Sequence, residues 1–442
     1  MDLAMNNLMQ NWWRSLQFLV AMTMGNTHHA EEILREIQDS GTKLLWTEKL
    51  YRNKILAEEA LQGYKNEVAT LIKQLEVQEL ELEFLKQQLE VYQLEETVLK
   101  PDEKFLDFIY NSFNLIEHDA NMLQCTGIEQ RIFDDFEANL YGFLNEEFQR
   151  LKRQPKFNSL VQEAINDINK IKQDQDPEYN LELSSHIYLM RCFLDNVYCA
   201  YLAWFFIYKS KLLPAKLNIL DLAAGPSTIA YGLALLLESN NAFSSLPPIH
   251  LSYYSLEQQK AFQYRGLQLW RQYMECQTNA TNAYFRFHTA NIFDYPSQAN
   301  RIPQKFFDFI TISHCFFYNL EVREKYNYIL QQIFTNHLKT NGHVLLIIQD
   351  KKLFMSYGVQ QTENHEQEES VVRTFVKELG LNLVWYKYLT STNSREYIAD
   401  FGKFAQENLP LQSYISPMAR QYLQLKHDLN YTLDDYVILA KK

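Results

Sequence analysis

The sequence has 442 residues, of which 47% are hydrophobic and 14% aromatic, a composition that supplies a sizeable core and excludes extended disorder. This length favours two or three domains. The formal net charge of −12 arises in the first part of the chain, because residues 1–200 carry 19 basic and 34 acidic side chains, whereas residues 201–442 carry 23 and 20. Since duplex-binding proteins present a strongly basic face, this charge argues against a nucleic acid partner.

The first hundred residues predict helices that include a long coiled coil. No proline precedes Pro101, and apolar side chains recur at heptad spacing. The a positions are Leu61, Val68, Leu75, Leu82 and Leu89, and the d positions are Tyr64, Leu71, Gln78, Leu85, Tyr92 and Leu99. This spacing is typical of coiled coils. Two arrangements satisfy it equally: a hairpin with another helix of the same chain, or an intermolecular seam with a second copy or a partner protein.

The next segment, residues 101–176, reads as further amphipathic helix after the proline, so we expect an all-α N-terminal region. A polar stretch at 169–183 then precedes an apolar helical stretch at 184–213. These changes predict three parts: N-terminal helices with the coiled coil at 1–100, a helical region at 101–176, and a third domain at 177–442.

From residue 217 the pattern changes to short runs rich in β-branched and aromatic residues that alternate with helical segments. The runs are 217–223, 249–257, 283–293, 306–313, 343–349, 381–389 and 435–442. Such alternation predicts an α/β fold, in which helices cover both faces of a mainly parallel, doubly wound sheet. The last two runs lack a convincing crossover helix, so we expect them to form an antiparallel pair at one edge.

The ends of the first two runs carry residues suited to a phosphate- or sugar-containing ligand. The first run ends at Asp221 and continues through Ala223 and Gly225 into a helix. Small residues let the backbone approach a ligand, and a helix start offers free N–H donors. The second run ends at Glu257, whose carboxylate can accept both hydroxyl groups of a ribose.

The ends of the next two runs complete the predicted crevice. Asn291 and Ile292 lie at the end of the third run, where an amide can read an adenine amino group and an apolar side chain can cover the ring. Ser313 and His314 end the fourth run on the opposite side of the same crevice. His314 is the candidate general base, because imidazole titrates near neutral pH; a histidine that only shapes the pocket would suit the same position.

This ordered series resembles the class I S-adenosylmethionine-dependent methyltransferases over about residues 184–442. The resemblance implies a seven-stranded Rossmann-like sheet whose seventh strand, 435–442, is antiparallel, and S-adenosylmethionine as the cofactor. It assigns cofactor binding to Asp221, Ala223, Gly225, Glu257, Asn291, Ile292 and Ser313, and it leaves His314 as the catalytic residue. This sequence has Ala223 and Ser227 where the family motif has glycines, and Asn291 where an aspartate is common.

The expected function is methyl transfer to an oxygen or nitrogen of a small molecule, a peptide or a protein. A fainter similarity, carried by the "GPST" turn and by "FFYNLEVREKYNYILQQIF", points to a methyltransferase family associated with the small ribosomal subunit, although the cysteine cluster of that family is missing. An rRNA-associated methyltransferase-like protein is therefore one alternative. The other is a catalytically degenerate methyltransferase fold that serves as a coiled-coil interaction protein.

The remaining features predict a cytoplasmic protein. The five cysteines contain no C-x-x-C pair, so neither a metal site nor a disulfide framework is expected. The N-terminus lacks a basic leader region, and no apolar run is long enough to span a membrane. Asp350 and the Lys351-Lys352 pair lie at the end of the fifth run, where they could touch a substrate, but they are expected at the surface.

Overall fold

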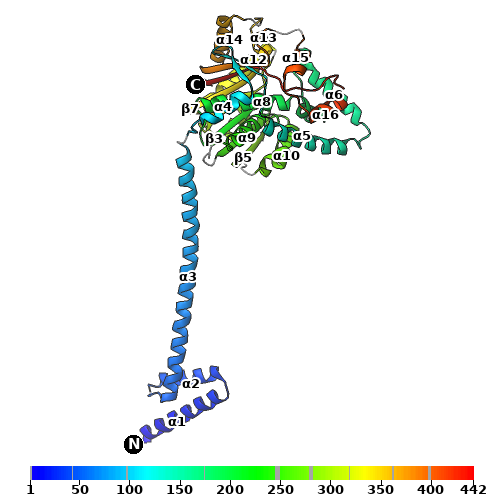
Figure 1. Ribbon diagram of the computed structural model, residues 1–442. Helices are drawn as coiled ribbons and strands as arrows, with labels where there is room; N and C mark the ends of the chain where they lie inside the picture. Colours follow the sequence, from blue (N-terminus) through cyan, green and yellow to red (C-terminus); the bar gives the residue numbers. More distant parts are fainter. Residues whose placement is uncertain are drawn as a thin grey trace. The chain divides into compact units, whose positions relative to one another are not determined.

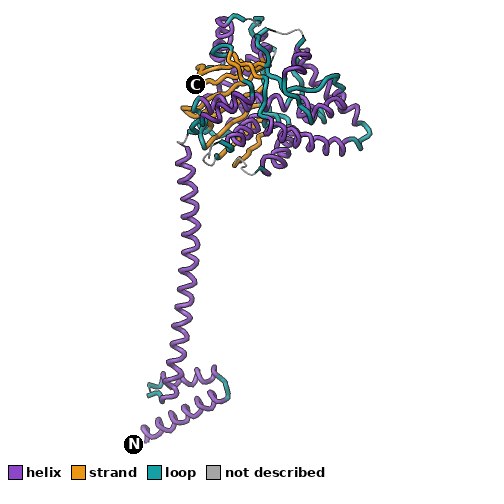
Figure 2. Tube along the Cα trace, viewed as in Figure 1, coloured by secondary structure: helices purple, strands orange, loops and turns teal. Residues whose placement is uncertain are grey.

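The structure is a computed structural model. It describes residues 2–41, 43–95, 98–173, 175–243, 249–277, 282–317, 319–360, 363–396 and 400–442. The chain divides into two compact units, Met1–Glu90 and Val91–Lys442. Figure 1 labels the elements of each unit, and Figure 2 separates helices from strands.

The regular elements in the described residues of the first unit are all helices. Its helices are α1 (Asp2–Thr23), α2 (Thr27–Asp39) and α3 (Trp46–Glu95). A small apolar cluster joins them, formed by Phe18, Ala21, Ala30, Ile33, Leu34 and Ile37, with Tyr51 of α3 packed against it. Asn26 begins α2, because its side-chain oxygen accepts a hydrogen bond from the backbone N–H of His29 at 3.2 Å.

The long helix α3 carries the predicted heptad stripe. The five apolar a and d side chains from Leu61 to Leu75 are between 52 and 67% exposed. Among the described residues of the first unit, no other segment covers this stripe. The side chains of residues 80–95 lie outside the described part, and the coiled coil stays a prediction.

The second unit contains helices on both sides of one large sheet. Its longer helices are α4 (Glu103–Ser112), α5 (Gln130–Leu151), α6 (Phe157–Asn169), α7 (Ser184–Arg191), α8 (Phe193–Lys209), α9 (Thr228–Asn240), α10 (Lys260–Tyr273), α12 (Leu320–His337), α14 (His365–Glu378), α15 (Phe401–Asn408) and α16 (Ile415–Leu423). Shorter helical turns are η1 (Lys170–Gln173), η2 (Met274–Cys276), η3 (Ile292–Asp294), α11 (Tyr295–Gln298), η4 (Ala299–Arg301) and α13 (Asp350–Met355).

The sheet has nine described strands, not the seven expected. Seven of them coincide with the predicted runs: β3 (Lys216–Leu222), β4 (His250–Glu257), β5 (Asn282–Thr289), β6 (Phe307–Ser313), β7 (Leu338–Gln349), β8 (Asn382–Thr390) and β9 (Asp434–Lys441). The strand order is β1-β2-β8-β9-β7-β6-β3-β4-β5. Read from β5 to β8, it is a doubly wound arrangement whose order reverses between β3 and β6.

The two additional strands correct the expectation of an all-α N-terminal region. β1 (Leu115–Glu117) and β2 (Met122–Cys125) form an antiparallel hairpin, and β2 pairs in parallel with β8 from Met122↔Tyr388 to Gln124↔Thr390. Strands this short show too few alternating residues for a periodic signal. Their pairing partner is also more than 250 residues away in sequence, so no local pattern announces it.

The last strand, β9, lies inside the sheet. It pairs antiparallel with β7 on one side and antiparallel with β8 on the other. The expected antiparallel pairing of the last two runs is therefore correct, but its expected place at an edge is wrong, because the β1–β2 hairpin extends the sheet beyond β8. The N-terminal end of β9 consequently lies at the edge where the parallel strands end.

Alternate side chains of the strands pack into separate cores on the two faces of the sheet. In β3, Leu217 and Ile219 join the cluster shared with α5, α8, α9, α10 and α16. Leu220 and Leu222 join the cluster shared with α12, α13 and α14. This period of two, with both faces apolar, is what a central strand of a covered sheet requires.

Helix α8 is the most apolar helix of the second unit and lies in its core. Trp204 is fully buried, donates a hydrogen bond from its indole N–H to the carbonyl oxygen of Ile229 at 3.0 Å, and packs edge-on against Phe309. Gly232 of α9 lets the two helices approach closely, because a Cβ there would lie 2.6 Å from that of Ala200. Across the described residues, no helix is both long and apolar enough to cross a membrane.

Candidate functional site

The pocket of interest lies where the strand order reverses. Helix α9 follows β3 and packs on one face of the sheet, whereas α12 follows β6 and packs on the other. A crevice opens between the carboxyl ends of such strands, and ligands of doubly wound folds bind there. The pocket found at this place is lined by residues that follow β3, β4, β5, β6 and β7 and by residues of the segment 171–196.

The turn after β3 holds its backbone in an uncommon conformation. Ala223, Gly225 and Ser227 have φ values of 51°, 52° and 67°, a left-handed region that costs a residue with a Cβ roughly 1–3 kcal/mol. Ala223 and Gly225 line the pocket. The backbone N–H of Gly225 donates to Glu257 Oε2 at 2.9 Å, which ties the turn to the end of β4.

Glu257 is the carboxylate of this pocket, as its position at the end of β4 predicts. Its side chain is nearly buried, and its two oxygens accept hydrogen bonds from the backbone N–H groups of Gly225 and Gln259. Burial raises the pKa of Glu257, and these N–H donors oppose that rise. Each carboxylate oxygen has a second lone pair, so both can still accept a hydrogen bond from a ligand hydroxyl.

Asp221 lies outside the residues that line the pocket. It is fully buried in β3, where Oδ1 accepts a hydrogen bond from Thr311 of β6 at 2.7 Å and Oδ2 accepts one from Tyr253 of β4. Burial raises its pKa to about 7. Asp221 therefore links three adjacent strands at the base of the turn, and its role as a direct cofactor ligand stays a prediction.

The other predicted cofactor residues meet at the pocket. Asn291 and Ile292 follow β5 and line it, as does Ser313 at the end of β6. Asn291 is exposed, and its side-chain oxygen accepts a hydrogen bond from the backbone N–H of Phe293 at 2.9 Å. Ile292 is buried beside it, so an amide and an apolar side chain stand together as the sequence implies.

His314 lines the same pocket and is held by three contacts. Its backbone N–H donates to the carbonyl oxygen of Ile347 at 2.8 Å, with φ at 57°. Its ring nitrogens contact Ser313 Oγ at 2.8 Å through Nδ1 and Asp435 Oδ1 at 3.0 Å through Nε2. A carboxylate can only accept, so Nε2 carries the hydrogen and Nδ1 accepts the hydrogen of the Ser313 hydroxyl. This Ser313–His314–Asp435 chain can take a proton from the pocket.

Asp435 is a partner of His314 that sequence reasoning missed. It begins β9, and because β9 is antiparallel, its first residues lie beside the last residues of β6 and β7. A search limited to the carboxyl ends of the strands therefore misses Asp435. The signal that could have found it is the pair of aspartates, Asp434 and Asp435, at the start of a strand already expected to be antiparallel.

The segment before α8 contributes an aromatic wall, Tyr179 and Tyr188, that no sequence motif predicted. Tyr179 and Tyr188 line the pocket, and each packs edge-on against Phe262 of α10. Asp167 holds the backbone of this wall, since its carboxylate accepts hydrogen bonds from the N–H groups of Glu178 and Tyr179. The rings of Tyr179, Tyr188 and Phe262 together form an aromatic part of the pocket lining.

Of the three residues expected at the surface after β7, Lys351 is exposed, but Asp350 and Lys352 are buried. Lys352 is 9% exposed and lines the pocket, and its ammonium group donates to the carbonyl oxygen of Phe316 at 2.9 Å and pairs with Asp176 at 3.3 Å. Asp350 is 1% exposed. Both belong to α13, and this short helix packs against β7, β9 and α14.

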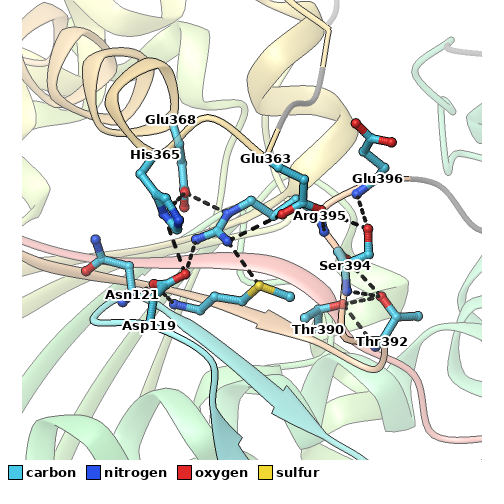
Figure 3. Close-up of polar contacts among 11 residues, drawn as sticks. Asp119, Asn121, Glu363, His365, Glu368, Thr390, Thr392, Ser394, Arg395 and Glu396 are labelled. Atoms are coloured by element: carbon cyan, nitrogen blue, oxygen red, sulfur yellow. Dashed lines mark hydrogen bonds and ion pairs between the residues drawn. The ribbon is translucent and has the colours of Figure 1, made fainter.

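A second polar cluster fastens the added hairpin to the rest of the sheet (Figure 3). The guanidinium of Arg395 lies between Glu368 at 2.7 Å and Asp119 at 2.9 Å, and Arg395 and Glu368 are both buried. Burial raises the pKa of Asp119, but backbone N–H donors and Arg395 outweigh it, so its pKa is lowered. This cluster is structural, because it connects the β1–β2 turn to α14 and the loop after β8.

No metal site accompanies the pocket in the described residues, where no group of three His, Cys, Asp or Glu side chains could hold an ion. Cys315 also lines the pocket. Burial raises its pKa to about 11, so its thiol is protonated at neutral pH and is a poor nucleophile.

Comparison with known proteins gives matches only among solved structures. No family model and no curated protein matches the chain. The matching solved structures include an S-adenosylmethionine-dependent methyltransferase from Methanosarcina mazei, which is 12% identical, covers 53% of this chain and 96% of its own, and has a TM-score of 0.30. They also include coclaurine N-methyltransferase bound to N-methylheliamine and S-adenosylhomocysteine, at 11% identity, 70% and 95% coverage and a TM-score of 0.32.

A third match is the fibrillarin pre-rRNA processing protein of Methanococcus jannaschii, at 12% identity, 51% and 66% coverage and a TM-score of 0.28. Identities and TM-scores at this level do not define the fold of this chain. Its description as a doubly wound α/β unit rests on the strand order and on the two covered faces of the sheet.

Proposed function

We propose that the second unit binds S-adenosylmethionine in the pocket at the β3–β6 reversal and transfers its methyl group to an oxygen or nitrogen of a small molecule, a peptide or a protein. One observation carries this proposal. One pocket brings together three features that follow different strands: the turn at Ala223 and Gly225, the carboxylate of Glu257, and His314. His314 is the middle member of the hydrogen-bonded Ser313–His314–Asp435 chain, which we call the relay.

The residues present fit the cofactor. Glu257 would accept hydrogen bonds from the ribose hydroxyls, since both of its oxygens retain lone pairs. Asn291 and Ile292 would contact the adenine, and the left-handed turn at Ala223 and Gly225 brings backbone rather than side chain to the ligand. S-adenosylmethionine supplies an activated methyl group on a sulfonium, so the protein needs chiefly to position the acceptor.

The chain's own contribution to the reaction is positioning and proton removal. As the acceptor oxygen or nitrogen gains a methyl group it loses a proton, which Nδ1 of His314 can hold, directly or through the Ser313 hydroxyl. Asp435 then faces the imidazolium from Nε2 at 3.0 Å and stabilises its charge. The aromatic wall at Tyr179 and Tyr188 excludes water from the part of the pocket that these two rings line.

Isothermal titration with S-adenosylhomocysteine, the expected product, tests the cofactor site. We expect micromolar affinity for the wild-type chain. Replacing Glu257 with alanine removes a charge-assisted hydrogen-bond pair worth about 1–3 kcal/mol, which weakens binding roughly 5- to 150-fold. The matched control is Asp294→Ala, which removes an exposed carboxylate close to Asn291 and should leave affinity unchanged.

No binding at millimolar ligand would refute the cofactor assignment. An acceptor screen with radiolabelled S-adenosylmethionine then addresses turnover. The relay predicts that Asp435→Asn lowers turnover far more than cofactor affinity, because the amide no longer stabilises an imidazolium. Equal turnover in wild type and Asp435→Asn would remove the relay from the mechanism.

A further inference from the structure

The most prominent feature outside the pocket is an exposed apolar stripe on α3. Its exposed fractions are 55% for Leu61, 67% for Tyr64, 54% for Val68, 52% for Leu71 and 57% for Leu75. These residues occupy successive a and d positions of one heptad frame. Away from the stripe, polar side chains bond along the helix itself, as in the hydrogen bond between Gln62 and Asn66.

The stripe is long enough to form a stable seam. In the sequence it continues from Leu75 to Leu82, Leu85 and Leu89, so that the distance from Leu61 to Leu89 is about 42 Å at roughly 1.5 Å per residue. Four heptads of apolar a and d residues are sufficient for a coiled coil. An exposed apolar stripe of this length marks an interaction surface.

Gln78 decides which partner fits. It occupies a d position within the stripe and is exposed. In a parallel, in-register pair of identical helices, Gln78 faces the same residue of the second copy, and two amides can hydrogen-bond to each other. Against an antiparallel copy, or a partner with an unbroken apolar seam, the amide would be buried without a hydrogen bond.

We therefore propose that α3 of two copies of this chain forms a parallel, in-register coiled coil through the stripe from Leu61 to Leu89. Such an interface is two-fold symmetric and closes on itself, so it yields a dimer rather than a chain of copies. The proposal rests on α3 alone and does not depend on the activity of the second unit.

Light scattering of the full-length chain at micromolar concentration measures the oligomeric state directly. We expect twice the chain mass of 52.5 kDa. Val68→Lys places an ammonium group at an a position and should weaken association at least about 100-fold, which gives a monomer. The matched control is Val77→Lys, because Val77 is 55% exposed but occupies a c position outside the seam; this variant should remain a dimer.

Cross-linking tests the orientation. Under mild oxidation with copper phenanthroline, Gln78→Cys should form a disulfide-linked dimer, because position 78 meets position 78 of the second copy. Val77→Cys should cross-link far more slowly, and the wild-type chain accounts for the native cysteines. Cross-linking at equal rates for the two variants would overturn the parallel, in-register alignment.

Either of two results would overturn the dimer itself: a wild-type chain that is monomeric at every concentration, or equal masses for Val68→Lys and Val77→Lys. Loss of folding does not confound the comparison, because both side chains are equally exposed in the single chain. The helical circular dichroism signal of each variant verifies this point.

Discussion

The two units of the chain use their apolar residues in opposite ways. In Val91–Lys442 two large clusters cover both faces of the sheet, and the core tryptophan Trp204 has no exposed surface. In Met1–Glu90 the buried cluster is small, whereas Trp12 is 65% exposed and the stripe of α3 is open. Because burial of apolar surface is the main stabilising term in folding, the second unit completes its core within one chain and the first directs much of its apolar surface outward.

A matched pair of tryptophan substitutions is the strongest test of this contrast. Trp204→Ala should lower the free energy of unfolding of the second unit by about 3–5 kcal/mol, because it leaves a cavity and removes the hydrogen bond to Ile229. Trp12→Ala should change stability by less than about 0.5 kcal/mol. Denaturant unfolding followed by circular dichroism measures both, and comparable losses would show that the exposed face of α1 is covered in solution.

The ion pairs around Arg395 offer a second contrast, now within the second unit. Arg395→Met leaves the buried Glu368 without its partner and should cost about 3 kcal/mol of unfolding free energy. Arg373 pairs with Glu369 on the same helix but is exposed, so Arg373→Met should cost less than about 0.5 kcal/mol. If the two variants unfold at the same denaturant concentration, the cluster does not hold the hairpin.

The pH dependence of stability should reveal Asp350. Burial raises the pKa of the Asp350 carboxyl to about 9, the negative charges of Asp434, Glu368 and Asp435 add to this rise, and the positive charge of Arg395 opposes it. In the unfolded chain the pKa is about 3.9. Between these two pKa values the folded chain keeps a proton on Asp350 that the unfolded chain has lost. The stability that this proton contributes is fully present below about pH 4 and is lost as the pH rises towards 9.

Asp350→Asn keeps the shape of the side chain and removes its titration. The slope of unfolding free energy against pH should become less negative by up to about 1.4 kcal/mol per pH unit between pH 5 and 8. Denaturant titrations of wild type and variant at several pH values measure this difference. Parallel curves would mean that Asp350 is ionised in the folded chain.

The smallest expected effects come from two asparagine caps, one in each unit. Asn26 caps α2 of the first unit, and Asn319 caps α12 of the second by accepting from the N–H of Val322 at 3.1 Å. Each change to alanine should cost about 1 kcal/mol. Hydrogen exchange should show Asn26→Ala loosening only the first unit and Asn319→Ala only the second; an effect that crosses between units would show that they unfold together.

The sequence predicted the parts of the second unit that depend on local periodicity. The seven long strands follow from runs of apolar residues bounded by polar turns, and the meeting of Gly225, Glu257, Asn291 and His314 follows from a rule about strand ends. Strands β1 and β2 could not be predicted, since four residues give no period and their partner β8 is distant in sequence.

The residues missed at the site share a different cause. Tyr179 and Tyr188 reach the pocket through packing between segments that are far apart in the chain, and no spacing rule encodes such packing. Asp221 shows the converse limit, because its position after a strand was predicted correctly while its side chain turns to Thr311 and Tyr253 instead of the pocket.

The place of β9 inside the sheet has a consequence for how the second unit folds during synthesis. During synthesis, β8 and the β1–β2 hairpin emerge before β9, yet only β9 joins them to β7. Until residue 441 is available, β7 and β8 each present an unpaired inner edge, the kind of surface on which aggregation begins. The sheet of the second unit therefore closes only when β9 has been made, and because β9 carries Asp435, the hydrogen bond between Asp435 and His314 forms at the same step.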